Sequence, residues 1–550
     1  MIPITVGFST PRLSVRVAAS SAAWGWLDTS MLALPKAFGL EAATRTVKFS
    51  HAIRMRHCFD LVPIVVLCLV LSGPSTAATD TSTHEWFSMI IEVRGLPDGA
   101  QGVPVWTPVD FSQVLHDANI PGTVDEKSLR LLRLAPNATE VEVPAQFSSR
   151  PQPRPKERPL LPGTPPTISY LGGYRPDGVP KDLRVAGQLC WVADGPTEGV
   201  CRYRLEFGVL RRGSFLQVPF PPQNLEAFDT QGRATPLRWF PRMQVRPLQP
   251  LDGGIDILEN HQLVTRYHVG PPKGSAGTSE PPIRRPFLYP VNGPDGIALT
   301  DFGKPHDPTG SHAHHYSIWI AHANVDAHDF WSEKGGLIAH ESFELLEDGP
   351  VFCRMVQRVT WLVAPASTKE KVLELLSERR ALTFYRGAPD SRLIDVELEF
   401  APTGRQPVPL GPTNFGFLAV RVAQSMTVFD GGGEVLNSRG DRNEREAHEK
   451  QADWIDQSGP VSAERWGGIA IFDHPDNPRH PTYWHCRNDG WAGAAFNLKE
   501  GYKVELDAPL RLKYRLCLHR HDAVRGNVTK RYAEYGAKPE IRISSVSPRR

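Results

Sequence analysis

Hydrophobic and polar residues alternate with a period of two in several stretches of the chain, such as CRYRLEF from Cys201 to Phe207 and LIDVELEF from Leu393 to Phe400. Successive side chains of a strand point to opposite faces, so this alternation predicts antiparallel strands with one buried face. Helical spacing occurs in KVLELLSERR, from Lys371 to Arg380, but so short an apolar run does not decide between helix and strand. A helix is predicted near the carboxyl end, around Thr529 to Tyr535.

Proline and glycine interrupt the pattern often, because the 550 residues include 51 Pro and 46 Gly, which disfavour long helices. We therefore predict an all-β protein, with an amino-terminal β-sandwich over residues 84–250 and a larger antiparallel β-sandwich over residues 255–540. By analogy, the larger unit is compared with the supersandwich of galactose mutarotases. Seven of the sixteen residues from Pro151 to Pro166 are proline, which predicts an insertion at 151–186 in the first sandwich.

Residues 1–78 are interpreted as a leader rather than as part of the fold. The segment that begins at Met55 has a charged start, an apolar stretch from Leu61 to Leu71 and small residues up to Ala78. The apolar stretch is shorter than the ~20 residues that a membrane-spanning helix needs. We expect cleavage near Thr79, a secreted or periplasmic mature chain without a membrane span, and a natural start at Met55; the alternative is an unusually long leader.

Charge and motifs exclude several functional classes. Lys and Arg number 62 against 60 Asp and Glu, a formal net charge of +2, and these charges are dispersed along the chain. Nucleic-acid binding needs a basic patch or stripe, so we expect no nucleic-acid partner. The sequence also lacks the motifs of nucleophile-elbow hydrolases, P-loop proteins and dinucleotide-binding proteins.

Two of the seven cysteines lie in the leader, and the other five include the close pair Cys190 and Cys201. The segment between them, WVADGPTEGV, is typical of a hairpin with a Pro and Gly turn. In an oxidising compartment such a hairpin can carry a cross-strand disulfide, which we predict here. The alternative is two buried free thiols.

Histidines concentrate in two segments that carry most of the candidate chemistry. The first is HAHHYSIWIAHANVDAHDFW, from His312 to Trp331, and the second is FDHPDNPRHPTYWHCRNDGW, from Phe472 to Trp491. A divalent metal ion needs three or four convergent nitrogen or oxygen ligands, and each segment supplies two plausible ones. The alternative is that these histidines cap turns and bond to backbone carbonyls.

The same segments carry a family resemblance. Together with RPFLYPVNGPDGIALT from Arg285 and ADWIDQSGP from Ala452, they resemble the bacterial family labelled "methane oxygenase PmoA" over residues 255–535. The label implies an integral membrane subunit, whereas this chain has no spanning segment after its leader, so we take no chemistry from it. The resemblance implies an exported or cytoplasmic all-β protein of carbohydrate-degrading bacteria, with its polar motif on both histidine segments, including His315.

Our first hypothesis is a carbohydrate-active enzyme with one polar pocket that joins the two segments, using acid–base or metal-assisted chemistry. The second is a non-catalytic glycan-binding or scaffold protein, and a metal-dependent oxidase is a distant third. The expected ligand is a carbohydrate or another small polar molecule, and a divalent metal ion is a possible cofactor. The candidate catalytic residues are His314, His480, Asp473, His474, His485 and Arg487; the candidate substrate-binding residues are Asn324, Asp329, Trp331, Asn477 and Trp484; the candidate metal ligands are His312, His314 and His485.

Overall fold

The computed structural model describes residues 84–135, 139–149, 185–196, 199–210, 226–228, 234–236, 242–248, 254–271, 283–303, 312–333, 335–363 and 371–549. The expected leader and nearly all of the proline-rich insertion lie outside these residues. Residues 81–550 form one compact unit. No helix in the described part of the chain has both the length and the apolar character needed to cross a membrane.

Two small sheets and one short helix make up the amino-terminal part of this unit. One sheet has the order β29-β1-β7-β3-β4, with β30 also paired to β1, and the other has the order β2-β6-β5. The elements are β1 (His84–Arg94), β2 (Val103–Asp110), α2 (Phe111–Asp117), β3 (Thr123–Leu134), β4 (Glu140–Val143), β5 (Ala145–Ser149), β6 (Ala186–Ala193), β7 (Val200–Leu210), β29 (Glu540–Ile543) and β30 (Ser547–Pro548). Their buried side chains form one hydrophobic cluster. The sheet that contains β1 therefore also includes β29 and β30 from the carboxyl end of the chain, which the sequence did not indicate.

The predicted disulfide is wrong, because Cys190 and Cys201 are both buried free thiols. Their strands are not partners in a hairpin: β6 pairs with β2 and β5, whereas β7 pairs with β1 and β3. Cys190 packs beside Phe352 and Tyr385, and the Cys201 thiol donates to the carbonyl oxygen of Asp194 at 3.3 Å. The chain thus passes from one sheet to the other between β6 and β7.

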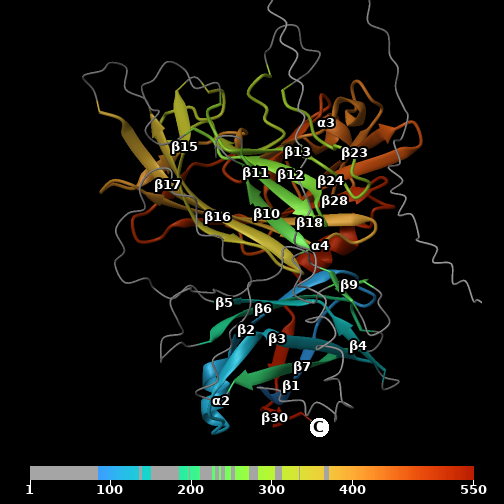
Figure 1. Cartoon of the computed structure of the whole chain (residues 1–550). Coiled ribbons are helices and arrows are strands. Elements are labelled where there is room, and N and C mark those ends of the chain that lie inside the picture. Colours follow the sequence, from blue (N-terminus) through green and yellow to red (C-terminus); the bar gives the residue numbers. More distant parts are fainter. Residues whose placement is uncertain are drawn as a thin grey trace, which may run out of the picture. The chain divides into compact units, whose positions relative to one another are not determined.

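Two large antiparallel sheets form the rest of the unit. The nine-stranded sheet has the order β10-β11-β12-β13-β14-β20-β26-β25-β22, and the eight-stranded sheet has the order β15-β16-β17-β18-β28-β24-β23-β21. The first contains β10 (Met243–Pro247), β11 (Ile255–Glu259), β12 (Gln262–His268), β13 (Phe287–Val291), β14 (Ile318–His322), β20 (Gly416–Arg421), β22 (Lys450–Gln451), β25 (Tyr483–Arg487) and β26 (Trp491–Ala494). Figure 1 shows β11, β12 and β13 of this sheet next to one another in green.

The second large sheet contains the longest strands. These are β15 (Gly336–Glu347), β16 (Phe352–Val363), β17 (Leu373–Tyr385), β18 (Ser391–Pro402), β21 (Glu434–Asn437), β23 (Trp454–Ser462), β24 (Arg465–Asp473) and β28 (Leu510–Arg520). Two small pairs, β8 (Glu226–Phe228) with β9 (Ala234–Pro236) and β19 (Val408–Leu410) with β27 (Tyr502–Val504), complete the strands. The helical elements here are η3 (Gln424–Met426), α3 (Asn443–Ala447) and α4 (Val528–Gly536).

The all-β prediction is confirmed, and the alternating stretches CRYRLEF and LIDVELEF lie in β7 and β18 with their apolar positions buried. The carboxyl-terminal helix is present as α4. In contrast, the stretch with helical spacing, Lys371 to Arg380, belongs mostly to strand β17. There β17 pairs along its length with β16 and β18, and this sheet context decides between helix and strand.

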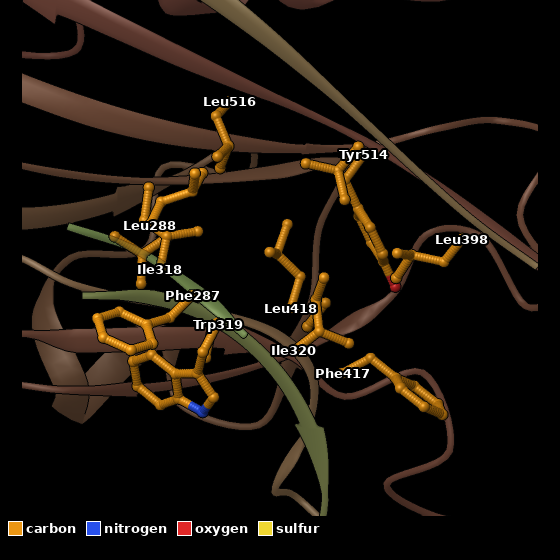
Figure 2. Packing of buried hydrophobic residues seen from close by; sticks show 14 of the residues in the cluster. Phe287, Leu288, Ile318, Trp319, Ile320, Leu398, Phe417, Leu418, Tyr514 and Leu516 are labelled. Atoms are coloured by element: carbon orange, nitrogen blue, oxygen red, sulfur yellow. The ribbon is translucent and has the colours of Figure 1, made fainter. Parts of the chain in front are cut away.

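In-register pairing gives the central strands of the nine-stranded sheet two distinct faces. One face carries a row of buried apolar side chains, Leu288, Ile318, Val420, Ala492 and Cys486. Figure 2 shows Leu288 and Ile318 on the side of their strands toward Leu516 of β28, whereas Phe287 and Trp319 lie together on the other side. The apolar row thus packs into the core between the two large sheets, and the opposite face carries buried aromatic residues as well as polar groups.

Candidate active site on the nine-stranded sheet

The opposite face of these strands carries a second row, one residue along from the first. Its members, aligned from strand to strand, are Phe287, Trp319, Ala419, Gly493 and His485. Ala419 and Gly493 leave little side chain between the rings of Trp319 and His485. A side chain added at Gly493 would meet the Trp491 indole at 3.4 Å, so the indole lies close to this small residue.

Trp491 links the two histidine-rich segments. Its ring centroid lies 5.3 Å from that of His315 and 4.1 Å from that of His485. His315 in turn lies 5.0 Å from His312 and 4.6 Å from His314. We call these five residues, His312, His314, His315, His485 and Trp491, the His–Trp site.

Buried aromatic rings hold the His–Trp site in place. His315 stacks on Trp319, with 5.2 Å between the centroids and 21° between the planes. Trp331, one of the predicted substrate-binding residues, lies 5.3 Å from Trp319 and 5.4 Å from Trp491. Because Trp331 is only 3% exposed, it packs against the rings of the site and does not offer a ring face to solvent.

Arg421 and Asp489 connect the two segments by charge. Arg421 ends β20 and pairs in register with Trp491, so both lie on the face of the His–Trp site. Its Nη1 donates to Nδ1 of His315 at 3.3 Å, and its Nη2 lies 3.7 Å from Oδ2 of Asp489. The same carboxylate oxygen lies 3.7 Å from Nε2 of His312. Since His315 accepts through Nδ1, its neutral form carries the ring hydrogen on Nε2.

A second guanidinium, that of Arg285, is fully buried just before β13. Its Nη2 donates to the carbonyl oxygen of Trp331 at 2.6 Å and lies 3.2 Å from Glu333 Oε1. Its Nε and Nη1 have no hydrogen-bond partner. Buried donors are rarely left unpaired, because each one costs about 1–3 kcal/mol. Burial lowers the pKa of Arg285, with Glu333 acting in the opposite direction.

Burial keeps the imidazoles of His314, His315 and His485 neutral at neutral pH. It lowers the pKa of His314 to about 4, helped by the nearby charge of Arg285, and that of His485 to about 3. It also holds the pKa of His315 well below its usual range, and Arg421 adds to this effect. His485 Nδ1 lies 3.0 Å from the carbonyl oxygen of Asn414 and donates to it. Nε2 of His485 therefore keeps its lone pair.

Other candidates from the second histidine segment form a separate group at the end of β24. Asp473 is 1% exposed, and its Oδ2 accepts from Nδ1 of His480 at 2.7 Å. Nε2 of His480 lies 3.4 Å from both Tyr532 Oη of α4 and Asp453 Oδ1. Asn477 donates to Asp473 Oδ1 and exchanges two hydrogen bonds with the Lys513 backbone. These bonds hold the 474–482 loop in place. Asp473, Asn477 and His480 therefore have a structural role here, which agrees with the alternative to a catalytic one.

The remaining candidates have separate local partners. His474 accepts from the backbone of Asp476 at 3.0 Å, and its ring contacts Tyr535 of α4. Trp484 is fully buried on the core side of β25 and donates to the Ala452 carbonyl at 2.8 Å. Arg487 is exposed, with its Nε 3.1 Å from Glu444. It lies two residues beyond His485, on the same face of β25.

Two predicted substrate-binding residues mainly organise loops. Asp329 Oδ1 accepts from the backbone of Trp331 at 2.7 Å and of Ser332 at 3.0 Å, which shapes the turn that places Trp331. The backbone nitrogen of Asn324 donates to His322 Nδ1 at 3.0 Å, and its carbonyl oxygen accepts from Gly411. We therefore assign both residues a role in loop structure, and the charge of Asp329 also acts on His314, whose pKa it tends to raise.

The predicted metal ligands His312, His314 and His485 do not form a metal site in the described part of the chain. Within the described ranges, no three or more His, Cys, Asp or Glu side chains are grouped so that they could hold a metal ion. His312 and His314 each contact His315, and His485 lies beyond Trp491. His485 thus packs against the Trp491 indole rather than against His312 or His314.

Sequence reasoning did not assign Arg285, Arg421, Asp489 or Trp491 to the site. A signal for Arg421 was available, because it ends the otherwise apolar strand GFLAVR, whose six residues are all buried. A charge in such a run needs a partner or a role. For Arg285 and Asp489 the sequence offered no comparable pattern.

Comparison with known proteins gives a family but no chemistry. The family model described as "Family of unknown function (DUF6807)" matches residues 254–533. No curated protein matches the chain. One solved structure that matches is a protein in the Glycosyl Hydrolase Family 38 from Enterococcus faecalis, at 10% identity and a TM-score of 0.32, covering 84% of this chain and 48% of that one. The chain spans about half of that structure's length, and so low a TM-score carries no argument.

The resemblance to the "methane oxygenase PmoA" family is thereby corrected. The matching model spans almost the same residues, but it describes a family of unknown function. The oxidase hypothesis that came with the label loses its basis.

Proposed function

The chain belongs to the DUF6807 family of unknown function, and from that premise we propose that it is a carbohydrate-active enzyme that works at the His–Trp site. The observation that carries this proposal is the contact of Trp491 with both His315 and His485. It assembles imidazoles from segments about 170 residues apart. Burying imidazoles beside guanidinium groups costs free energy, and such perturbed groups cluster at functional sites.

Charge balance favours a neutral, hydroxylated substrate. Arg421 lies 3.7 Å from Asp489, and Arg285 lies 3.2 Å from Glu333, so each buried guanidinium has a carboxylate partner. A balanced site offers no net positive potential to attract a phosphorylated substrate. Sugar hydroxyls both donate and accept hydrogen bonds, which suits a site of imidazole acceptors and guanidinium donors.

The proposed chemistry is proton transfer. His314 is half-buried and neutral at neutral pH, so it can accept a proton from a sugar hydroxyl or ring carbon. The unpaired donors of Arg285 would hold the oxygen on which negative charge develops. His485, with its Nε2 lone pair, is a second proton acceptor on the same face.

Replacement of His314 tests this proposal. The wild-type protein is incubated in D₂O with a panel of neutral mono- and oligosaccharides, and NMR follows bond cleavage, epimerisation or loss of C–H signals. His314→Ala should abolish any turnover while the melting temperature stays nearly unchanged. The matched control is His116→Ala, which removes an imidazole that is 83% exposed on α2. A wild-type protein that leaves the whole panel unchanged, or an active His314→Ala variant, contradicts the proposal.

Non-catalytic glycan binding is the second candidate. It is favoured by the ring of Phe302, which is 39% exposed and stacks on Tyr316 next to His315. The same panel separates the two functions, because a binding protein gives saturable affinity without any product. In that case His314→Ala changes affinity alone.

We also propose that the protein is exported, on the basis of the signal-like segment from Met55 to Ala78. These residues lie outside those that the structure describes. Amino-terminal sequencing of the protein from the extracytoplasmic fraction should begin at Thr79 or one residue earlier. A chain that still begins near Met1 contradicts the proposal.

A further inference from the structure

Two phenylalanines with exposed side chains lie in segments whose backbones are bonded to Arg421 and to Asn488, the residue before Asp489. Phe302 is 39% exposed and Phe429 is 76% exposed. Leaving an apolar side chain of this size in water forgoes about 1.5–3 kcal/mol of burial. Single exposed apolar residues need no explanation, but two aromatic rings tied to one polar site do.

Phe302 is fixed beside the first histidine segment. Its ring lies face to face with that of Tyr316, with 4.7 Å between the centroids and 12° between the planes, and Tyr316 directly follows His315. Asp301, the residue before it, donates its backbone N–H to the carbonyl oxygen of Arg421 at 3.3 Å. The ring of Phe302 is therefore fixed on the neighbour of His315, and the backbone just before it is bonded to that of Arg421.

Phe429 is fixed beside the second segment. Its backbone N–H donates to the carbonyl oxygen of Asn488 at 3.0 Å, and Asn488 directly precedes Asp489. The loop that carries Phe429 is closed on itself, since Thr427 accepts backbone hydrogen bonds from Asp430 and Gly431. A short, bonded loop thus presents an apolar ring to solvent, and its backbone is bonded to the residue before Asp489, whose carboxylate lies near His312 and Arg421.

We propose that Phe302 and Phe429 are sugar-stacking residues at the edge of the His–Trp site, so that the substrate is a neutral saccharide chain rather than a single sugar. This inference rests on the proposed function. A sugar ring presents hydroxyls at its rim and C–H groups on its faces, so it can stack on an exposed aromatic ring while a neighbouring unit makes hydrogen bonds to imidazole and guanidinium groups. The balanced charges of the site agree with a neutral chain.

Binding as a function of chain length tests the inference. A glycan array first identifies the class of saccharide that the protein retains, and calorimetry then measures affinity for one to six units of that class. Affinity should rise with length, and Phe429→Ala should weaken binding of the longest chain about fivefold to tenfold with no effect on a single unit. The matched control is Val524→Ala, at a side chain 68% exposed in the turn before α4. The array and the circular dichroism spectrum confirm that both variants are folded.

The possible failures are distinguishable. If single units bind as tightly as chains, or if Phe429→Ala binds every length like the wild type, the stacking role is wrong and the proposed function stands. If Val524→Ala weakens binding as much as Phe429→Ala does, the effect is not specific to the site and the stacking role is again wrong. If the wild-type protein retains no glycan, the proposed function fails and the inference fails with it.

Discussion

The imidazole of His485 and the indole of Trp491 lie 4.1 Å apart between ring centroids, on strands that pair directly. The indole also lies 5.3 Å from the ring of His315. Trp491 therefore contacts both imidazoles and links the two histidine-rich segments. Trp491 was not among the predicted catalytic residues, yet it connects the histidines of the two segments.

Replacing Trp491 should disturb both imidazoles together. Trp491→Leu removes the indole ring current, so the NMR signals of the His315 and His485 rings are both expected to shift, and the free energy of unfolding should fall because a buried ring is lost. Trp466→Leu is the control, since that indole is 36% exposed on β24. A shift of only one of the two imidazoles would show that Trp491 does not bridge them.

Protonation of the site should require strongly acidic conditions. Burial lowers the pKa of His314 to about 4 and of His485 to about 3, so both bases stay neutral from pH 8 down to about pH 5. The base form is lost as the pH falls through these values. Carbon-13 NMR of the histidine rings should show His480, whose pKa is raised by Asp473, titrating at higher pH than either. Titration of His314 above His480 would contradict the assignment.

His480 should make stability depend on pH. Its hydrogen bond to Asp473 raises its pKa, so the folded state binds the proton more tightly than the unfolded chain, whose pKa is about 6.5. This stabilisation is complete below about pH 6.5 and is lost as the pH rises through the raised pKa. Urea unfolding at pH 6 and pH 8.5 should therefore show a smaller fall in stability for His480→Gln than for the wild type.

His474 is the matched control for this experiment. Burial lowers its pKa, so His474→Gln should change the pH dependence in the opposite direction. If stability depends on pH equally in the wild type and in His480→Gln, the Asp473–His480 bond does not contribute to the pH dependence of the free energy of unfolding. At pH 6, His480→Gln removes the charged hydrogen bond between His480 and Asp473, and the free energy of unfolding should fall by about 1.5–3 kcal/mol.

The cysteines should behave as thiols. Cys190, Cys201, Cys353, Cys486 and Cys517 are all free and buried. After denaturation without reductant, all five should be alkylated, and reductant should leave the urea midpoint unchanged. If peptide mapping shows that Cys190 and Cys201 become alkylated only after reduction, the two thiols are linked and the free-thiol assignment is wrong.

Local patterns in the sequence were sufficient for the strands and for the faces that they bury. CRYRLEF and LIDVELEF have a period of two because each strand has one face against the core, and this depends only on neighbouring residues. The helix α4 was predictable for the same reason. The segment before Arg380 was not, because its apolar run fits both periods and only its strand partners decide between them.

Partnership between distant segments was decided by the tertiary structure. The sequence by itself determined that the protein is all-β, where its alternating strands lie, and which two segments hold its histidines. It could not determine that β6 and β7 enter different sheets, or that His485 and His315 both contact Trp491 while His480 bonds to Asp473. Alternation specifies which side of a strand is buried, whereas strand order and register, set by packing of the whole core, specify which side chains from distant strands meet.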